Sequence, residues 1–147
     1  MADRLTASER SALMSRIRGA NTGTELRVFR ELRRRRVYFA KHASALPGRP
    51  DVVFRSVRLA VFIDGDFWHG RRFANWRGKI SKFWVDKISR NIRRDRANDR
   101  QLRRAGWKVI HLWSKVVDRA PEKAVDRVLR ARARLLHKRA GPDRKAP

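Results

Sequence analysis

The fold of this 147-residue chain is decided by residues 59–70, which read LAVFIDGDFWHG. The first five, residues 59–63, are all apolar, as expected of a strand that is buried on both faces. The apolar run ends at Asp64, and a second aspartate, two aromatic residues and a histidine follow before Gly70. This pattern predicts a central strand that leads into a polar and aromatic loop, where functional side chains are usually found.

The chain before this strand predicts two helices and two further strands. Residues 45–50, ALPGRP, have the composition of a turn and bring Asp51 to the start of a strand over Val52–Arg55. The other elements expected there are a helix over Thr6–Arg18, a loop over Gly19–Gly23, a helix opened by Thr24 and Glu25 and ended by Arg33–Arg36, and a strand over Val37–Ala40.

The chain after the loop predicts the order helix, strand, helix. The first of these helices runs roughly over Ser81–Arg104, and Gly106 follows it at a position that favours glycine. A strand over Trp107–Trp113 and a helix that begins at Pro121 complete the order. We therefore predict an α/β fold with a mixed central sheet flanked by helices.

A chain of this length has room for one compact domain, which we place at residues 1–140, ahead of a disordered tail over residues 141–147. It carries 39 Lys and Arg against 14 Asp and Glu, and the resulting net charge of +25 requires a polyanionic partner such as nucleic acid. The 41% hydrophobic content and five Trp exclude a merely disordered basic tail.

Three absences narrow the class further. The sequence contains no Cys, which excludes a disulfide framework and a thiolate zinc site. No apolar run approaches the length of about 20 residues that crosses a bilayer, and the N-terminus MADRLTASER lacks the apolar core of a signal peptide. We expect a soluble protein of the cytoplasm, associated with the nucleoid.

The acids at the strand ends predict a site for a hard divalent cation. If the strand that follows Asp51 neighbours the strand that ends at Asp64, Asp51 converges with residues 63–66. Mg²⁺ prefers oxygen ligands of this kind and can assist phosphodiester cleavage. The simpler alternative is that Asp51, with the proline before it, only begins a turn.

A histidine in the loop is the candidate general base. His69 lies just beyond the central strand and can take a proton from an attacking water, because its ordinary pKa lies near neutrality. The alternative is a surface imidazole bonded to the backbone. The other histidines, His42, His111 and His137, have no comparable neighbours in sequence and are interpreted as structural.

The long helix offers a second acid. Asn91 and Asp95 are four residues apart and therefore lie on one helix face. An aspartate that points towards the end of a sheet needs a partner, and a metal-bound water or a histidine would serve. The alternative is an ion pair of Asp95 with Arg94 or Arg96. Glu25 is interpreted as an acid that favours the dipole of its own helix.

Aromatic and cationic side chains alternate in residues 67–84. Aromatic wedges can enter between base steps while cations hold phosphates, although about half of these aromatics are expected in the core. The aromatics are Phe67, Trp68, Phe73, Trp76, Phe83 and Trp84, and the cations are Arg71, Arg72, Arg77, Lys79 and Lys82. Trp107 and Trp113, on a predicted strand, are expected in the core.

Together these motifs resemble the very short patch repair (Vsr) DNA mismatch endonucleases in order and spacing. The resemblance covers roughly residues 13–113. It is carried by Leu46–Asp51 (LPGRPD), Val61–His69 (VFIDGDFWH), Phe83-Trp84, Lys87-Ile88, Asn91, Arg94-Asp95, Gly106–Val109 (GWKV) and Trp113.

The resemblance implies the fold of type II restriction endonucleases. It also implies Mg²⁺-dependent nicking of duplex DNA beside a thymine mispaired with guanine, the product of 5-methylcytosine deamination. By the same resemblance, Asp51 and the backbone carbonyl of Ile63 bind the metal and His69 acts on the attacking water, while Asp95 and Glu25 support the site. The DNA contacts implied are wedges at Phe67, Trp68 and Trp84, and a contact in the opposite groove at Met14, within an N-terminal arm over residues 1–20.

Two departures from the family matter. Family members commonly hold a structural zinc with Cys and His residues, and the corresponding positions here are Asp66, Arg71 and Phe73. We expect no structural zinc, with the packing of Phe73 and Trp76 in its place. A histidine common in the family is replaced by Asp64, an extra carboxylate that we expect to act at the metal.

The preferred interpretation is a monomeric, Mg²⁺-dependent endonuclease of double-stranded DNA, with Mn²⁺ as a substitute ion and mismatch-repair proteins as candidate partners. Its catalytic residues would be Asp51, His69, Asp95, Glu25 and Asp64, and its metal ligands Asp51, Ile63 and Asp64. Phosphate contacts are expected from Arg49, Arg71, Arg72, Lys79, Lys82, Arg90 and Arg93, and further DNA contacts from Met14, Phe67, Trp68, Trp84 and Asn91.

Three alternatives stay open. The chain could be a restriction or defence nuclease that reads no mismatch, or a non-catalytic binder that keeps the nuclease fold. A ribosome-associated basic protein would explain the charge but not the loop of acids and histidine. Asp51 discriminates among them, because a pure binder has no need of that carboxylate.

Overall fold

The computed structural model describes Thr6 and residues 22–140. Apart from Thr6, the predicted helix over Thr6–Arg18, with Met14 in it, lies outside the described residues, as does the tail over residues 141–147. No helix of the described part is both long and apolar enough to cross a membrane.

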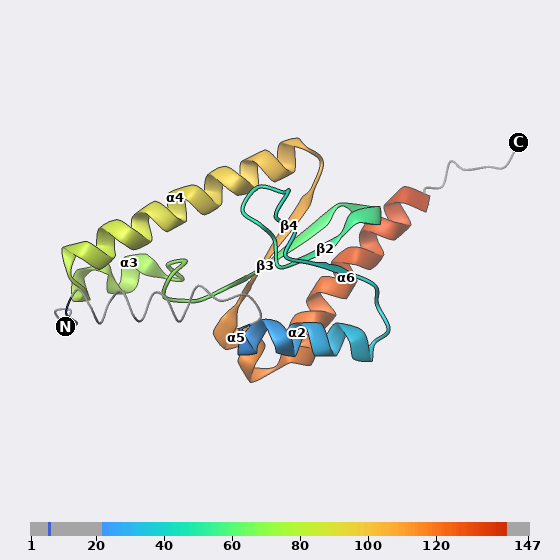
Figure 1. The fold of residues 1–147 in the computed structure, drawn as a ribbon, viewed down its shortest axis with the longest axis horizontal. Helices are drawn as coiled ribbons and strands as arrows, with labels where there is room; N and C mark the ends of the chain where they lie inside the picture. The colour runs from blue at the N-terminus through green and yellow to red at the C-terminus, as the bar shows by residue number, and fades with distance from the viewer. Residues whose placement is uncertain (1–5, 7–21, 141–147) are drawn as a thin grey trace, which may run out of the picture.

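Within the described residues, the centre of the molecule is a mixed sheet of four strands: β1 Ala40–Lys41, β2 Val52–Phe54, β3 Leu59–Asp64 and β4 Lys108–Trp113 (Figure 1). Their spatial order is β1-β2-β3-β4, with β1–β2 and β2–β3 antiparallel and β3–β4 parallel. β3 therefore has neighbours on both sides, as its apolar sequence predicts.

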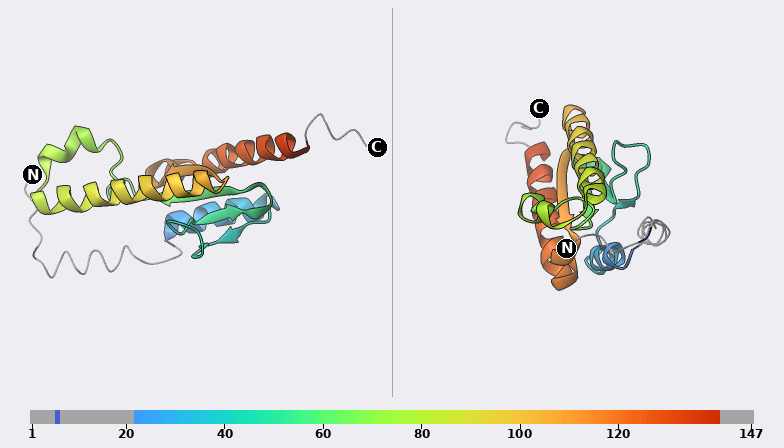
Figure 2. Two further views of the ribbon diagram at one scale, coloured as in Figure 1. Left: turned by 90° about the horizontal axis from the view of Figure 1, so that it is seen from above. Right: turned by 90° about the vertical axis from the view of Figure 1, so that its left-hand side faces the viewer.

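Helices cover both faces of this sheet. The long helix α4, Lys82–Arg104, packs on one face through Leu102. The opposite face is covered by α2 (Gly23–Arg34), α5 (Ser114–Arg119) and α6 (Pro121–Ala140), which also contact one another (Figure 2). The predicted α/β fold with a mixed, helix-flanked sheet is confirmed.

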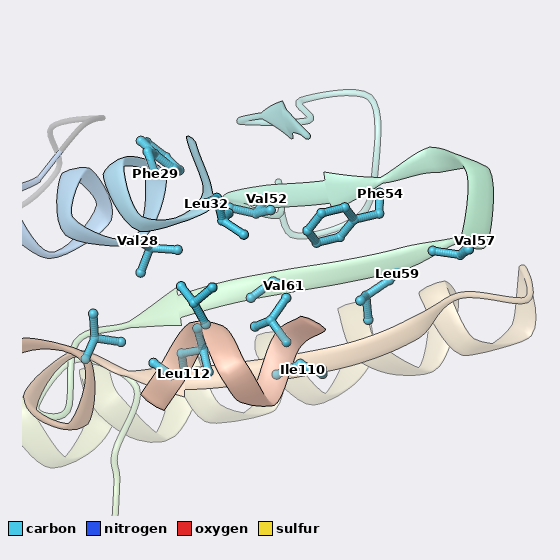
Figure 3. Close-up of a cluster of buried hydrophobic side chains, with 14 residues drawn as sticks. Val28, Phe29, Leu32, Val52, Phe54, Val57, Leu59, Val61, Ile110 and Leu112 are labelled. Carbon is cyan, nitrogen blue, oxygen red and sulfur yellow. The ribbon is translucent and has the colours of Figure 1, made fainter. Parts of the chain in front are cut away.

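Alternation along β3 separates two buried cores. Leu59 and Val61 join the larger core with Phe29 of α2 (Figure 3), while Ala60 and Phe62 face the α4 side. Adjacent residues of a strand point to opposite faces, so a slip of one position would exchange the two sets. Asp64 continues the Ala60–Phe62 series and therefore also lies on the α4 side.

Helix α2 begins earlier than the sequence predicts. Thr22 is its N-cap: the Thr22 hydroxyl accepts a hydrogen bond from the Glu25 amide at 3.3 Å, and the Glu25 carboxylate accepts one from the Thr22 amide at 3.2 Å. This reciprocal capping box satisfies backbone donors at the helix start. The expected helix is therefore present, but it starts at Gly23, one residue before Thr24. Of the expected loop over Gly19–Gly23, residues 19–21 lie outside the described residues.

The predicted strand over Val37–Ala40 is also wrong, because strand pairing begins only at Ala40. The amide of Val37 donates to the Leu32 carbonyl at 3.1 Å and so closes the end of α2 instead of joining the sheet. Arg36, with a φ of 56°, turns the chain at this point.

Helix α4 follows its prediction closely, with Ser81 as N-cap and Gly106 beyond its end at a φ of 87°. Besides the 3-10 turn η1, Arg55–Val57, three short elements of the described residues were not predicted. They are the helix α3, Phe73–Trp76, the 3-10 turn η2, Arg77–Lys79, and α5.

Candidate active site

A cavity of about 530 Å³ opens where β3 ends. It gathers side chains from the start of α2, the turn before β2, the loop after β3 and α4. The sequence-predicted residues that line it are Glu25, Arg49, Asp51, Ile63, Asp64, Trp68, His69 and Asn91. Asp95 lies behind His69, in the wall of a second cavity of about 470 Å³.

Asp51 lies directly before β2 and is held there by the backbone of β3. Its Oδ2 atom accepts a hydrogen bond of 2.7 Å from the backbone amide of Ile63, because the antiparallel pairing of β2 with β3 brings the two residues together. His42 stands beside both acids, with Nδ1 3.9 Å from Asp51 Oδ1 and Nε2 3.8 Å from Glu25 Oε2. Single ligand atoms of Glu25, His42 and Asp51 all lie within 4.8 Å of one another.

This crowding changes the acidity of Asp51. Burial of its carboxyl raises the pKa of Asp51 from 3.8 to about 7, helped by Glu25 and Asp64, while the amide of Ile63 opposes the change. In the metal-free protein, Asp51 therefore holds its proton up to neutral pH. A divalent cation among these oxygens would reverse that preference.

His69 is oriented by an acid on α4. Its Nδ1 atom lies 2.6 Å from Oδ2 of Asp95, and Arg94 stands 4.0 Å from the other oxygen of Asp95. Burial opposes the charged imidazole, but the bond to Asp95 and the nearby Asp64 raise the pKa of His69 above 6.5. Because Nδ1 faces a carboxylate, the proton of neutral His69 belongs on Nδ1, which leaves Nε2 as the basic nitrogen.

The loop after His69 packs closely on α4. Gly70 has a φ of 67°, and a Cβ built there would lie 2.5 Å from Ile92 Cδ1, so only glycine fits without displacement. The side-chain amide of Asn91 donates a hydrogen bond of 2.9 Å to the backbone carbonyl of Trp68. Asn91, expected in DNA contact, therefore also ties the loop to the helix.

A second acid–histidine pair lies behind the first. His111 of β4 binds Asp64 through Nδ1 at 2.6 Å and Asp99 through Nε2 at 2.8 Å. Burial opposes protonation, but Asp64 and then Asp99 raise the pKa of His111 to about 9. The interpretation of His42 and His111 as merely structural missed these contacts. The strand alternation that places His111 on the Asp64 face was the available signal.

Asp66 joins the loop to the end of β4. Its Oδ1 atom accepts hydrogen bonds of 3.1 Å from the Ser114 hydroxyl and from the Lys115 amide, and its Oδ2 atom lies 3.1 Å from Arg71. Burial opposes ionisation of Asp66, but these three donors lower its pKa. Arg71, expected at a phosphate, is thus ion-paired inside the protein and also lies over the ring of Trp113.

The aromatic residues form one connected group, defined here as the aromatic cluster of Phe67, Trp68, Trp76, Phe83 and Trp84. The Phe67 ring lies 5.0–5.5 Å from the rings of Trp68, Trp76 and Trp84. Trp84 is 5% exposed, whereas Phe67 is 38% and Phe83 43% exposed. Part of the cluster is therefore core and part faces solvent, as the sequence predicts. Phe73 and Trp76 also pack edge to face, as expected.

The remaining residues predicted to contact phosphates lie on several elements. Arg49 lines the first cavity and Arg72 the second. Lys79 ends η2, Lys82 begins α4, and Arg90 and Arg93 lie further along that helix. Trp107 and Trp113 are partly buried.

Comparison with known proteins identifies the family. A family model for the DNA mismatch endonuclease Vsr matches residues 2–75. The type II nicking enzyme V.NmeDIP of Neisseria meningitidis serogroup C is 35% identical over 115 residues, which are 76% of this chain and 78% of the relative. The type II nicking enzyme V.XorIIP of Xanthomonas oryzae is 37% identical over 115 residues, 77% of this chain and 85% of the relative.

The DNA mismatch endonuclease Vsr of Escherichia coli is 33% identical over 134 residues, 90% of this chain and 85% of the relative. The mixed sheet flanked by helices agrees with the restriction-endonuclease-like fold of this family. The chain therefore belongs to the Vsr family of DNA endonucleases.

Proposed function

We propose that this protein nicks one strand of duplex DNA beside a T:G mismatch, using Mg²⁺, with Mn²⁺ as a substitute. The observation that carries the proposal is that one cavity holds both a pair of crowded carboxylates and a histidine oriented by an acid. Glu25 and Asp51 supply crowded carboxylates, and Asp95 holds His69 with its basic nitrogen available. Family membership and the similarity to the mismatch endonuclease of Escherichia coli support the choice of substrate.

The donor set suits a hard divalent cation. Asp51 and Asp64 offer carboxylate oxygens, and burial and repulsion keep Asp51 protonated up to neutral pH without a cation. We assign the ion to Asp51, Asp64 and the carbonyl of Ile63, with Glu25 supporting the site. Oxygen ligands of this kind match Mg²⁺. When bound, the ion would stabilise charge on the phosphate and favour ionisation of water.

The chain's own residues handle the proton. Nε2 of His69 accepts it from the attacking water, and Asp95 holds the ring in the required tautomer and stabilises the imidazolium that forms. Gly70 permits the loop to lie against α4, which keeps His69 at the cavity.

DNA is held by cations and aromatic rings. Exposed Phe67, together with Trp68 and Trp84 behind it, is positioned to wedge between base steps. The phosphate contacts proposed are Arg49, Arg72, Lys79, Lys82, Arg90 and Arg93, with Met14 in the opposite groove. A monomer is sufficient for one nick, and mismatch-repair proteins are proposed as partners.

A second candidate is nicking without a mismatch requirement. It is favoured by the number of relatives whose names describe type II nicking enzymes. The catalytic residues would be the same, and only the DNA recognised would differ.

A nicking assay separates these functions. End-labelled duplexes with one T:G mismatch, or fully paired, are incubated with Mg²⁺ or Mn²⁺ and either wild type or Asp51→Ala. We expect a nick only in the mismatched duplex and a loss of at least about 1000-fold in Asp51→Ala, as for other catalytic groups whose removal disables the site. Equal nicking of both duplexes favours the second candidate, and tight binding without any nicking favours a non-catalytic binder.

A further inference from the structure

Asp64 is held between two histidines on the α4 side of the sheet. Its Oδ2 atom lies 2.6 Å from Nδ1 of His111, and its Oδ1 atom lies 3.9 Å from Nδ1 of His69. One oxygen is therefore committed to His111, while the other faces the catalytic loop. Asp64 is only 4% exposed, so the partner it has in the protein decides its orientation.

His111 is itself fixed from several sides. Its Nε2 atom lies 2.8 Å from Oδ2 of Asp99, and its ring stacks on Phe62 with centroids 4.9 Å apart and planes 12° apart. A carboxylate stands at each ring nitrogen, and carboxylates only accept hydrogen bonds when ionised. Contacts at both ring nitrogens therefore fix the orientation of His111, and its Nδ1 atom stands directly at Asp64.

Helix α4 supplies the anchor for both histidines. Asp95 and Asp99 are one turn apart and hold His69 and His111 respectively. His111 and Asp99 line the second cavity but not the first. Asp64 lines both cavities, so its contact with His111 connects the second cavity with the first.

We propose that His111, held by Asp99, is a positioning residue that orients Asp64 for metal binding. This inference rests on the proposed function, in which Asp64 is a metal ligand. A carboxylate with one oxygen bonded to a fixed imidazole ring cannot rotate freely, so its other oxygen, Oδ1, stays on the side of His69. Removal of a group that orients a metal ligand typically reduces metal affinity or activity by about 10–100-fold.

Two substitutions isolate this role. His111→Phe keeps a ring to stack on Phe62 but removes both hydrogen bonds. His111→Gln keeps an N–H donor for Asp64. His137→Phe is the matched control, because His137 is exposed on α6. Mn²⁺ binding to the full chain is measured by electron paramagnetic resonance, and nicking of the T:G duplex is measured against Mn²⁺ concentration.

We expect His111→Phe to weaken Mn²⁺ binding by at least about tenfold and to raise the Mn²⁺ concentration for half-maximal nicking equally. His111→Gln should fall between this variant and wild type, and His137→Phe should match wild type. Asp99→Asn should shift both readouts in the same direction as His111→Phe. A merely structural role would instead lower thermal stability without moving the Mn²⁺ dependence.

The proposal is overturned if folded His111→Phe binds Mn²⁺ like wild type and nicks at within about twofold of its rate. If His111→Phe does not fold, the same criterion applies to His111→Gln and Asp99→Asn. Wild type that binds Mn²⁺ without nicking contradicts the proposed function alone, and Mn²⁺ binding by the variants then decides about His111. Wild type that binds no Mn²⁺ overturns both.

Discussion

Burial and the neighbouring acids disfavour the ionised form of Asp51, and a bound cation would offset both effects. Its carboxyl is buried, stands beside Glu25, and senses Asp64, so its pKa rises from 3.8 to about 7. A metal that needs the ionised carboxylate must displace this proton whenever the pH is below about 7. Metal binding at Asp51 would therefore be linked to proton release.

Proton release on metal binding is the resulting prediction. Below pH 7, each pH unit should weaken Mn²⁺ binding by about tenfold, and above pH 8 the affinity should be flat. Calorimetry at pH 6 in two buffers of different ionisation enthalpy should give different apparent binding enthalpies, and the same pair at pH 8.5 should agree. Equal enthalpies in both buffers at pH 6 would contradict the raised pKa of Asp51.

His69 and His111 show which residues of the candidate site the sequence can predict and which it cannot. The acids and aromatic residues around His69 in the sequence predict it as a candidate general base. His111 lies in an apolar strand, where a histidine usually has a satisfied structural role, and its partners Asp64 and Asp99 come from two other elements. The parallel pairing of β3 with β4 brings His111 beside Asp64, and the packing of α4 brings Asp99, so strand alternation alone was an incomplete signal.

At the scale of elements, the loop from Gly65 to Lys79 is attached to the sheet by Asp66. Its carboxylate reaches Arg71 within the loop, and Ser114 and Lys115 at the start of α5, directly after β4. The indole of Trp76 also donates to the Arg71 carbonyl at 2.9 Å. In a chain without cysteine, these hydrogen bonds cross-link the segment that carries His69.

Loss of Asp66 should loosen this loop. We expect Asp66→Ala to lower the free energy of unfolding by about 1–3 kcal/mol, the usual effect of removing charge-assisted hydrogen bonds. Asp118→Ala, which removes a solvent-exposed ion pair with Arg27, should change it by less than about 1 kcal/mol. Urea unfolding at pH 7 measures both.

The pH dependence of Asp66 provides the control. Its pKa is lowered in the folded protein, so its stabilising effect is complete above the ordinary value of 3.8 and is lost as the pH falls further. The difference between wild type and Asp66→Ala should therefore shrink in acid.

Chelation with EDTA should leave the unfolding midpoint unchanged, and a large decrease would instead point to a structural metal.

The predicted elements succeeded where long patterns repeat. The apolar run of β3 and the capped, periodic helix α4 were recognised from sequence with nearly their observed bounds. The strand expected over Val37–Ala40 failed because the Val37 amide is used to end α2. The short elements α3 and α5 have four and six residues, too few to show a helical period.

For the whole molecule, the net charge of +25 governs the encounter with DNA. Each phosphate that a protein cation neutralises releases counterions, so the logarithm of the binding constant should fall with the logarithm of salt at about 0.9 per contact. We expect Lys82→Ala to reduce that slope by about 0.9. Lys123→Ala, exposed on α6, should leave it unchanged.

This measurement uses duplex DNA in EDTA, so that no strand is cut. Titration between 50 mM and 200 mM salt, the range over which such interactions weaken steeply, gives the slope for each variant. A nearly flat response of wild type would argue against duplex DNA as the partner.

During synthesis, the acids of the site leave the ribosome before the strand that completes the sheet. β3 gains its second neighbour only when β4 is made, and Leu102 of α4 then meets Val109. A chain halted before residue 108 carries Asp51, Asp64 and His69 but lacks β4 and, with it, the His111 side chain that contacts Asp64. Because such a domain folds as a unit, we expect fragments that end before residue 108 to lack nicking activity.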